Sequence, residues 1–330
     1  MPNILVTGAS GCSGKGVLHY LTSKGYQDVK ALVRKLPVDP VPSVEYLIGD
    51  ITDEQRMVEI LKENGIDHIW HLAAAVHRSV KKNQFFTINA YGTQKLLEAA
   101  IDSGAKSFTY SSTTGVYGRI KEIPVKENHR TKPWGTYSKS KLKAEQIILE
   151  KCEESGISAN ILRLPMILGK GDRHVFPVIS KLIKYNFLPL LGNPKHRISI
   201  AHPYDIAKAF EVVTNANPSH NDIYHVTSCD LTWKELIYEI EKQLYGKKRF
   251  KFYVPYLVFF LGTWAYEAIY SILSPLREPV INREYAQMVG REWTFDIDKI
   301  KKLGFEPIMK KEEIIKDIIS EEVTPIPEEK

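Results

Sequence analysis

The stretch NILVTGASGCSGKG, residues 3–16, places three glycines, Gly8, Gly11 and Gly14, directly after a short apolar run. The apolar run predicts a buried strand, and the residues that follow the last glycine predict a helix. Glycine lets the backbone turn tightly and approach a pyrophosphate, whose charge is met by amide groups at the helix N-terminus. An ordinary glycine-rich turn has the same spacing, so that alternative stays open here. The residues expected to contact a dinucleotide are Gly8, Ser10, Gly11, Cys12, Ser13 and Gly14.

Short β-type runs and helical periods alternate through the first half of the chain. Strands joined by helices of this length form right-handed crossovers, which produce a parallel sheet covered by helices on both faces. The sequence therefore predicts an α/β fold with a doubly wound parallel sheet. Strands are expected at 3–6, 29–33, 44–48, 68–72, 107–111 and 159–162, and helices at 14–24, 53–63, 85–103 and 137–155.

Beyond residue 164 the pattern loosens into segments punctuated by proline and glycine, which predicts a smaller C-terminal α/β lobe. We expect residues 1–165 to form the dinucleotide-binding domain, with 197–226 returning to it. The substrate lobe then consists of 166–196 and 227–319. Residues 320–330 combine prolines with acids and predict a mobile tail.

The composition is that of a globular protein. Hydrophobic residues make up 43% and charged residues 25% of the 330 positions, which excludes disordered, collagenous and coiled-coil chains. The net charge of +6 comes mostly from scattered residues and gives no indication of nucleic-acid binding. The three cysteines are widely spaced and form no CxxC pair, so neither disulfides nor a metal site are predicted. A reducing cytosol fits best, and no signal peptide is recognisable at the N-terminus.

Residues 252–276 are largely apolar and follow the basic run KKRFK, residues 247–251. A spanning helix needs ~20 clean apolar residues, and Glu267 interrupts this stretch, so spanning is disfavoured. Contact with a membrane surface through 247–276 stays open, which would make a cytoplasmic protein peripheral to a membrane. The aromatic residues of the block would either cover an apolar ligand or form the core of the small lobe.

Arg34 stands at the end of the second expected strand, where an NAD-selective site usually has Asp or Glu for the ribose 2′-hydroxyl. A guanidinium attracts a 2′-phosphate instead, so the sequence favours NADP, with Lys35 as support. Arg34 as a solvated strand-end charge, with NAD as cofactor, is the alternative.

Two further strand ends carry candidate cofactor contacts. Asp50 follows the third strand and can accept a hydrogen bond from an adenine amino group, or alternatively cap the next helix. The small residues of HLAAAVH leave room for a flat ligand, and its histidines, His71 and His77, are interpreted as packing and loop residues. The expected contacts here are Asp50, Ile51, Leu72, Ala73 and Ala74.

The pattern with the most chemical content is Thr113 after the fifth strand, followed by Tyr137 and Lys141 in YSKSK. Residues four apart share a helix face, so an ammonium can lie beside the phenol and favour its ionised form. A base working at neutral pH needs such a cation, because tyrosine titrates near ~10. The Thr113 hydroxyl can hold the substrate oxygen whose proton Tyr137 moves.

In this order, the motifs resemble those of the extended short-chain dehydrogenases/reductases, the NAD-dependent epimerase/dehydratase superfamily. The matching segments are TGASGCSG, GDI, HLAAA, NAYGT with Asn89, YSSTTGVYG, YSKSK, LRLPMILGKGD and HPYDIAKAF, ending near Phe210. The resemblance implies a Rossmann-like domain in which Thr113, Tyr137 and Lys141 are catalytic. It also implies that Asn89 supports the site and that Pro165, with Tyr137 and Lys141, contacts the cofactor.

The branches of this superfamily differ in ways that the sequence can weigh. Dehydratases carry Asp-Glu after the catalytic Thr, where this chain has Thr114 and Gly115. Nucleotide-sugar epimerases commonly have Asn where Met166 stands. Two parts of the chain are instead similar to proteins of the 3β-hydroxysteroid dehydrogenase-like branch. They are LRLPMILGKGD, residues 162–172, and a closing pattern of Phe295, Asp296, Lys299 and LGF, residues 303–305.

The resemblance therefore implies an NAD(P)-dependent enzyme that transfers hydride between nicotinamide and a hydroxyl or keto carbon of a sterol- or lipid-like substrate. A nucleotide-sugar 4-epimerase is the alternative, and a non-catalytic NADP-binding regulator is a second one. We expect a small-molecule substrate, no nucleic-acid partner and a homodimer.

Overall fold

The computed structural model describes residues 2–76, 80–172, 176–216, 221–249, 251–279 and 281–320. Its largest element is a seven-stranded sheet in the order β10-β6-β5-β4-β1-β2-β3, with all neighbours parallel. The strand order reverses between β1 and β4, and such a reversal opens a ligand crevice at the carboxyl ends of the strands. The predicted Rossmann-like fold is confirmed. The strands are β1 (Ile4–Thr7), β2 (Val29–Val33), β3 (Glu45–Ile48), β4 (His68–His71), β5 (Ser107–Thr113), β6 (Ser158–Leu164) and β10 (Asp222–His225).

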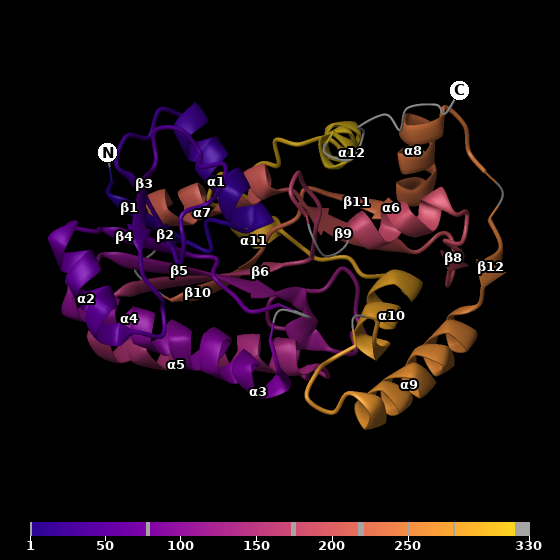
Figure 1. Cartoon of the computed structure of the whole chain (residues 1–330), viewed down its shortest axis with the longest axis horizontal. Coiled ribbons are helices and arrows are strands. Elements are labelled where there is room, and N and C mark those ends of the chain that lie inside the picture. The colour runs from indigo at the N-terminus through magenta and orange to yellow at the C-terminus, as the bar shows by residue number, and fades with distance from the viewer. Residues whose placement is uncertain are drawn as a thin grey trace.

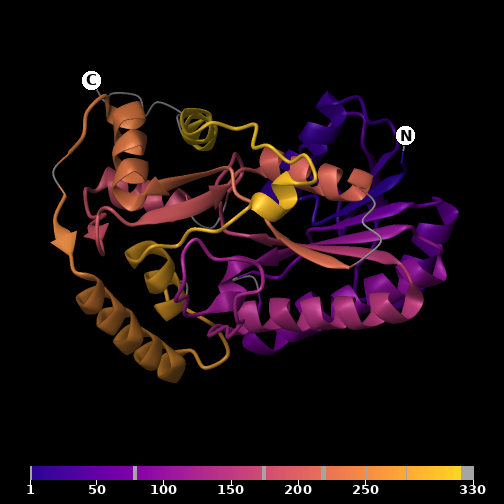
Figure 2. The same ribbon diagram turned by 180° about the vertical axis from the view of Figure 1, so that it is seen from behind.

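Helices cover both faces of this sheet (Figures 1 and 2). On one face α1 (Cys12–Ser23) packs against α7 (Pro203–Ala216). On the other face lie α2 (Glu54–Glu63), α4 (Thr93–Asp102) and α5 (Thr136–Ser155). Of the 197–226 segment that is expected to return to the first domain, α7 and β10 add a helix and an edge strand to it, whereas the strand β9 (Arg197–Ala201) lies in the sheet of the smaller lobe.

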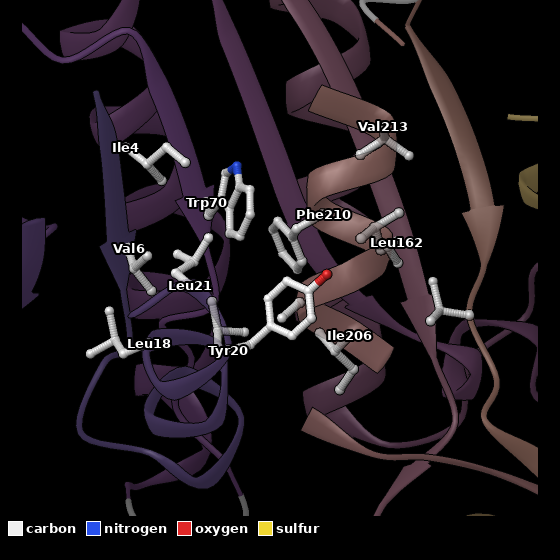
Figure 3. Close-up of a cluster of buried hydrophobic side chains, with 14 of the residues drawn as sticks. Ile4, Val6, Leu18, Tyr20, Leu21, Trp70, Leu162, Ile206, Phe210 and Val213 are labelled. Carbon is white, nitrogen blue, oxygen red and sulfur yellow. The ribbon is translucent and has the colours of Figure 1, made fainter. Parts of the chain in front are cut away.

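The apolar core lies between the sheet and these helices. In Figure 3, Ile4 and Val6 of β1 face Leu18 and Leu21 of α1, while Trp70 and Phe210 meet nearby. The centres of the Trp70 and Phe210 rings are 5.3 Å apart. The intervening Leu5 of β1 is buried in a second cluster on the opposite face. This alternation follows from strand geometry and explains why the parallel strands read as continuous apolar runs.

Two elements differ from the sequence-based expectation. The long helix predicted at 85–103 is three consecutive pieces: α3 (Lys82–Phe85), the π-helical η1 (Phe86–Gly92) and α4. The fifth strand continues to Thr113, so the candidate hydroxyl is the last residue of β5 rather than part of a loop. Most of the expected mobile tail, residues 321–330, lies outside the described residues.

The smaller lobe has its own core. Its centre is the three-stranded sheet β11-β9-β7, and α6, α8 and α12 contribute buried residues around it. The elements of this part are η2 (Thr114–Tyr117), β7 (Met166–Ile167), α6 (Phe176–Lys184), β8 (Leu190–Leu191), β9 (Arg197–Ala201), β11 (Cys229–Thr232), α8 (Trp233–Tyr245), β12 (Tyr253–Val254) and α12 (Lys311–Ile319). The short helix α11 (Asp298–Lys301) instead packs on β10, and its Ile300 belongs to the core of the first domain.

Two further helices lie at this end of the molecule, one on the outside and the other packed against the core of the smaller lobe (Figures 1 and 2). They are α9 (Tyr256–Leu273) and α10 (Arg283–Gly290), and together with residues 274–279 they form what we call the arm. Of the 18 residues of α9, only Thr263 is buried. By length and composition α9 is apolar enough to cross a membrane, although the core helix of a soluble protein passes the same test. A core helix would be mostly buried, and α9 is not.

Candidate active site

The glycine turn has the geometry of a dinucleotide cradle. Gly8 has φ +69°, a left-handed conformation that favours glycine, and a Cβ there would lie 2.6 Å from the backbone nitrogen of Ala73. The amide of Gly11 donates to the Gly8 carbonyl over 3.0 Å. Gly11 caps α1 without a side-chain hydrogen bond, and the first turn of α1 holds no acid. The exposed amides and the helix dipole therefore fit a pyrophosphate.

The other predicted contacts of the glycine turn lie in the turn itself or at the start of α1. Ser10 is exposed at the tip of the turn, and Ser13 lies in the first turn of α1. The Cys12 thiol donates to the carbonyls of Gly169 and Lys170, over 3.5 and 3.4 Å, and so ties the start of α1 to the segment after β7. Pro165 is buried between β6 and β7 on the same side. Their cofactor contacts stay predictions.

At the ends of β2 and β3 the expected adenosine contacts lie as follows. Arg34 follows β2 and is exposed. One oxygen of Asp50 accepts from the Thr52 amide, at 2.9 Å, and from its hydroxyl, at 2.8 Å. Asp53, not Asp50, caps α2 by accepting from the Arg56 amide. Asp50 thus shapes its own turn, and its second carboxylate oxygen accepts no hydrogen bond from the described residues. Ile51 beside it is buried.

A buried hydrogen-bond chain supports the floor of the site under Leu72, Ala73 and Ala74. The Ala73 amide donates to the Thr7 hydroxyl, which donates to His71 Nδ1 over 2.6 Å. His71 Nε2 in turn donates to the Thr93 hydroxyl over 2.9 Å, and Thr93 donates to the Asn89 carbonyl. Because the Thr7 hydroxyl already accepts from the Ala73 amide, its proton is directed to His71 Nδ1, which assigns the neutral ring protonated on Nε2. Burial agrees, because it lowers the pKa of His71 to about 3. His77 lies outside the described residues.

Asn89 joins this floor to the catalytic helix. It is fully buried in the π-helical segment, where its side-chain oxygen accepts from the Ala75 amide over 2.7 Å. Its nitrogen donates to the Ala75 carbonyl and to the Ser140 hydroxyl, each over 3.0 Å. Segments with π-helical geometry often occur at functional sites. Asn89 therefore positions the loop after β4 and α5 relative to each other.

The three proposed catalytic residues come from β5 and α5. Tyr137 and Lys141 lie one turn apart at the start of α5, and the Tyr137 ring meets Phe85 edge-on, with centres 6.2 Å apart. Thr113 ends β5, and its hydroxyl accepts from the Gly115 amide over 3.1 Å. The start of α5 packs on η2, directly after Thr113, so the fold brings the three residues into one region. Their catalytic roles stay predictions.

Burial shifts the pKa values of both Tyr137 and Lys141. The ammonium of Lys141 lies 4.1 Å from the centre of the Tyr110 ring, and burial lowers its pKa to about 7. The pKa of Tyr137 is raised, first by burial and second by the charge of Glu284. The causes of the raised Tyr137 pKa are burial and Glu284, and the ammonium of Lys141 faces the Tyr110 ring, so the expectation that Lys141 favours the ionised phenol stays a prediction.

One turn beyond Lys141, α5 carries a buried carboxylate that sequence analysis missed. Glu145 forms two hydrogen bonds with Arg163 of β6, Nη2 to Oε2 at 2.7 Å and Nε to Oε1 at 3.1 Å. It also accepts from the Ser112 hydroxyl of β5. Arg163 donates to the hydroxyl of Tyr117 over 2.8 Å. The signal in the sequence is the spacing of Tyr137, Lys141 and Glu145, which places all three on one helix face.

A pocket of about 240 Å³ lies where the arm meets the start of α5. Trp134 and Trp264 lie on its wall together with charged residues of both signs, so it is neither an apolar slot nor a basic diphosphate site. Gly135 lines it, whereas Tyr137 and Thr113 do not. Its lining residues are Lys82, Trp134, Gly135, Trp264, Glu267, Ala268, Ser271, Glu278, Pro279, Asn282, Arg283 and Glu284.

Half of the basic run before the arm is turned inwards. Lys251 and Arg249 both bind the buried Glu241, with N–O distances of 2.5 and 3.1 Å. Only Lys247 and Lys248 are exposed among its described residues. A fully buried carboxylate needs partners, and Glu241 takes Arg249 and Lys251. Lys247 and Lys248 are therefore the cations of KKRFK that can face the anionic headgroups of a membrane.

Comparison with known proteins identifies relatives over most of the chain. A family model described as the NAD dependent epimerase/dehydratase family matches residues 4–227. The N-acetyl-alpha-D-glucosaminyl-diphospho-ditrans,octacis-undecaprenol 4-epimerase of Escherichia coli O157:H7 is 26% identical over 308 residues, 92% of this chain and 90% of that protein. The 3beta-hydroxysteroid-dehydrogenase/decarboxylase isoform 2 of Arabidopsis thaliana is 24% identical over 302 residues, which cover 84% of this chain and 51% of that protein.

Solved structures share the fold. A UDP-glucose 4-epimerase from Thermotoga maritima superposes with a TM-score of 0.72 at 22% identity, over 96% of this chain and 97% of that one.

The lowered pKa of Lys141 predicts a pH-dependent stability. Between about pH 7 and its ordinary value of 10.5, the unfolded chain holds more protons on this group than the folded chain, so stability rises with pH across this window. Lys141→Met removes the buried ammonium and should raise the free energy of unfolding by on the order of 1–3 kcal/mol at about pH 6. The gain should shrink at about pH 9, as measured by urea unfolding. The exposed Lys139→Met on the same helix is the control, and an equal gain at both pH values would contradict the prediction.

Proposed function

Since the chain belongs to the NAD dependent epimerase/dehydratase family, we propose that it is an NAD(P)-dependent oxidoreductase that acts on a hydroxyl or keto carbon of a substrate with a large apolar part. The observation that carries this proposal is α9, an apolar helix left exposed beside the pocket that adjoins the catalytic helix. A relative named a 3beta-hydroxysteroid-dehydrogenase/decarboxylase supports it.

In this proposal each candidate residue has one task. The dinucleotide, when bound over the glycine turn, supplies or accepts the hydride. Tyr137 exchanges a proton with the substrate oxygen, and the Thr113 hydroxyl orients that oxygen by a hydrogen bond. Lys141 adds positive charge next to the reacting groups when it is protonated, and Asn89 keeps α5 and the site floor in place. Buried, pre-positioned groups of this kind need no rearrangement during the reaction.

The preferred cofactor in this proposal is NADP. Arg34 is exposed at the end of β2, where the described residues offer it no carboxylate partner, and Lys35 follows it. A guanidinium in this position suits a 2′-phosphate. NAD, the cofactor of the family and of several solved neighbours, is the alternative.

We also propose that α9 holds the protein on a membrane surface. Its outer residues recur every three or four positions and are well exposed, for example Leu261 at 52%, Ile269 at 58% and Ile272 at 80%. Its inner side is tied to the protein by Glu267, whose carboxylate accepts from the Arg283 amide and guanidinium. The half-buried inner side carries Phe259 and Phe260 as well as Glu267, so that the exposed apolar side is left to lie in the plane of a membrane interface.

Cations at the two ends of α9 agree with an anionic surface. Arg277 is exposed shortly after the helix ends, and the Lys82 amide donates to the Leu276 carbonyl, which brings α3 alongside. At the other end Arg291 lies 4.4 Å from the centre of the Tyr256 ring. Together these residues would bind acidic headgroups while the apolar side enters the lipid. The protein would then be a cytoplasmic, peripheral one.

A 4-epimerase is the second candidate function. A relative that spans nearly the whole chain is named as a 4-epimerase of a sugar on undecaprenyl diphosphate, a substrate with an apolar tail. Lys82 and Arg283 line the pocket, although Arg283 is already paired with Glu267. The two candidates differ in one measurable way. The oxidoreductase consumes NADPH with a 3-ketosteroid, whereas the epimerase interconverts UDP-glucose and UDP-galactose without net change of NAD.

Tyr137→Phe tests the chemistry. Turnover should fall by ~10²–10⁴, because the proton donor is lost while the ring keeps its packing against Phe85. NADPH binding, followed by fluorescence titration, should stay within a few-fold of wild type. The same substitution at the exposed Tyr91 is the control and should leave turnover unchanged. Full activity of the Tyr137 variant would refute the assignment.

Arg34→Asp tests the cofactor. The substitution removes the attraction for a 2′-phosphate, adds repulsion and supplies an acceptor for a ribose hydroxyl, so preference should move from NADP to NAD. The ratio of the two dissociation constants, measured by titration of wild type and variant, is the readout. Wild-type protein that binds NAD clearly more tightly than NADP would show that Arg34 does not contact the cofactor.

Replacing Leu261, Ile269 and Ile272 together by Glu tests the membrane surface. Wild type should sediment with vesicles that contain phosphatidylglycerol, and the triple variant should stay in solution with unchanged NADPH binding, because charge on the outer side opposes burial in lipid. Glu at Ile48 and Phe187, exposed apolar residues away from the arm, is the control. If the triple variant changes the oligomeric state but not sedimentation, α9 is a contact between copies instead.

A further inference from the structure

The catalytic helix α5 lacks a cap of its own. Its N-cap residue, Gly135, makes no side-chain hydrogen bond, and its first turn contains no acid. A helix start leaves amide groups without intrahelical partners, and these need acceptors when they are shielded from water. The acceptors here come from the arm. Glu278 accepts from the Thr136 amide over 2.6 Å, and Glu284 accepts from the Gly135 amide over 3.2 Å.

Glu284 also touches the residues on both sides of the proposed catalytic groups. Its Oε1 accepts from the hydroxyl of Ser138, the neighbour of Tyr137. A Cβ on Gly115, two residues after Thr113, would lie 2.5 Å from the same oxygen, and one on Gly135 would lie 2.6 Å from Oε2. Only glycine at these two positions leaves room for the carboxylate. Glu284 is thus inserted between the turn that follows β5 and the first turn of α5.

We propose that Glu284 is a positioning residue for Tyr137: it holds the start of α5, through Gly135 and Ser138, against the turn after Thr113. This inference rests on the proposed role of Tyr137 in proton transfer. Nothing in the family match extends to α10, since the matched residues end at 227.

The charges around Glu284 make its ionisation sensitive to pH near neutrality. Glu278, on the segment before α10, and Glu267, on α9, both disfavour its charged form, whereas Ser138 and Gly135 of α5 stabilise it by hydrogen bonds. Arg283, the neighbouring cation on α10, is bound to Glu267, and Lys82 lines the same pocket from α3. Burial dominates and raises the pKa of Glu284 to about 7. The charge of Glu284 in turn contributes to the raised pKa of Tyr137.

The position of Glu284 connects the proton chemistry to the arm. Arg283, next to it in sequence, binds Glu267 in the middle of α9 through its amide and its guanidinium. α9 and α10 also pack against each other. A displacement of α9 by lipid or substrate is therefore transmitted to the carboxylate at the start of α5. An acid whose role is limited to complementing the dipole of α10 would lie on the surface and would not contact the start of α5.

The test is Glu284→Gln, with Glu306→Gln, the same change at an exposed acid, as the control, measured with NADP and a 3β-hydroxysteroid. Oxidation requires ionised Tyr137, so the rate falls on the acid side of its pH profile. Glu284→Gln keeps the size and most hydrogen bonds but removes the opposing charge. It should move the acid limb to lower pH by on the order of one pH unit. Glu306→Gln should leave the limb in place. No movement in the first variant, or equal movement in both, overturns the proposal.

A second measurement does not depend on the substrate. Because folding raises the pKa of Glu284 from 4.5 to about 7, the folded chain holds more protons in that window, and stability is lost as pH rises through it. Glu284→Gln should therefore raise the urea midpoint relative to wild type at about pH 8 but not at about pH 5. If Glu284→Gln changes the urea midpoint relative to wild type by the same amount at both pH values, the charged role of Glu284 is overturned. Failure to oxidise any 3β-hydroxysteroid, with the stability result as expected, refutes the proposed substrate class and leaves the placement of Glu284 supported.

Discussion

The buried ion pair between Arg163 and Glu145 is the interaction on which the geometry of the site depends. Both side chains are almost inaccessible, at 4% and 2%, and they join β6 to α5 in the middle of the fold. Removing one partner of such a pair commonly costs about 3–5 kcal/mol, because the remaining charge is left buried without compensation. The pair therefore fixes α5 in one rotation about its axis. With Glu145 held inwards, Lys141 and Tyr137 on the same face must also point into the sheet edge.

The groups around this ion pair are arranged so that they do not titrate near neutral pH. His225 accepts a hydrogen bond from Tyr117 through Nε2 and donates through Nδ1 to the Asp296 carbonyl, so it is neutral in this network. Burial lowers its pKa to about 3, as it does for His71 on the other side of α5. Burial moves the pKa values of two groups near Tyr137, Lys141 and Glu284, to about 7. Both ends of the turn that carries Tyr137 therefore respond to pH near neutrality.

Sequence patterns predicted the parts of the site that depend on neighbouring residues, and they missed the contacts between segments that are distant in the sequence. The glycine turn at Gly8 and the Tyr137–Lys141 spacing were recognisable because strand, turn and helix chemistry act over a few residues. Glu284 was not recognisable in the sequence. It stands two residues after Asn282, the N-cap of α10, and an acid in that position is typical of an ordinary helix start. Its insertion at α5 depends on contacts 146 and 149 residues apart. The inward turn of Lys251 also depends on tertiary structure, although its partner Glu241 lies only 10 residues earlier, on α8.

The exposed apolar surface of α9 restricts how the arm can be attached to the rest of the protein. The outer side of α9 is exposed, whereas Val289 of α10 is buried in the core of the smaller lobe and Phe259 of α9 packs against that core. Carboxylates add directional attachments to this apolar packing: Glu267 within the arm, and Glu278 and Glu284 to the start of α5. Hydrogen bonds from a helix N-terminus are directional, whereas apolar contacts allow sliding. These hydrogen bonds therefore help to fix the arm in register with the start of α5, and they connect the exposed apolar helix α9 to the helix that carries Tyr137.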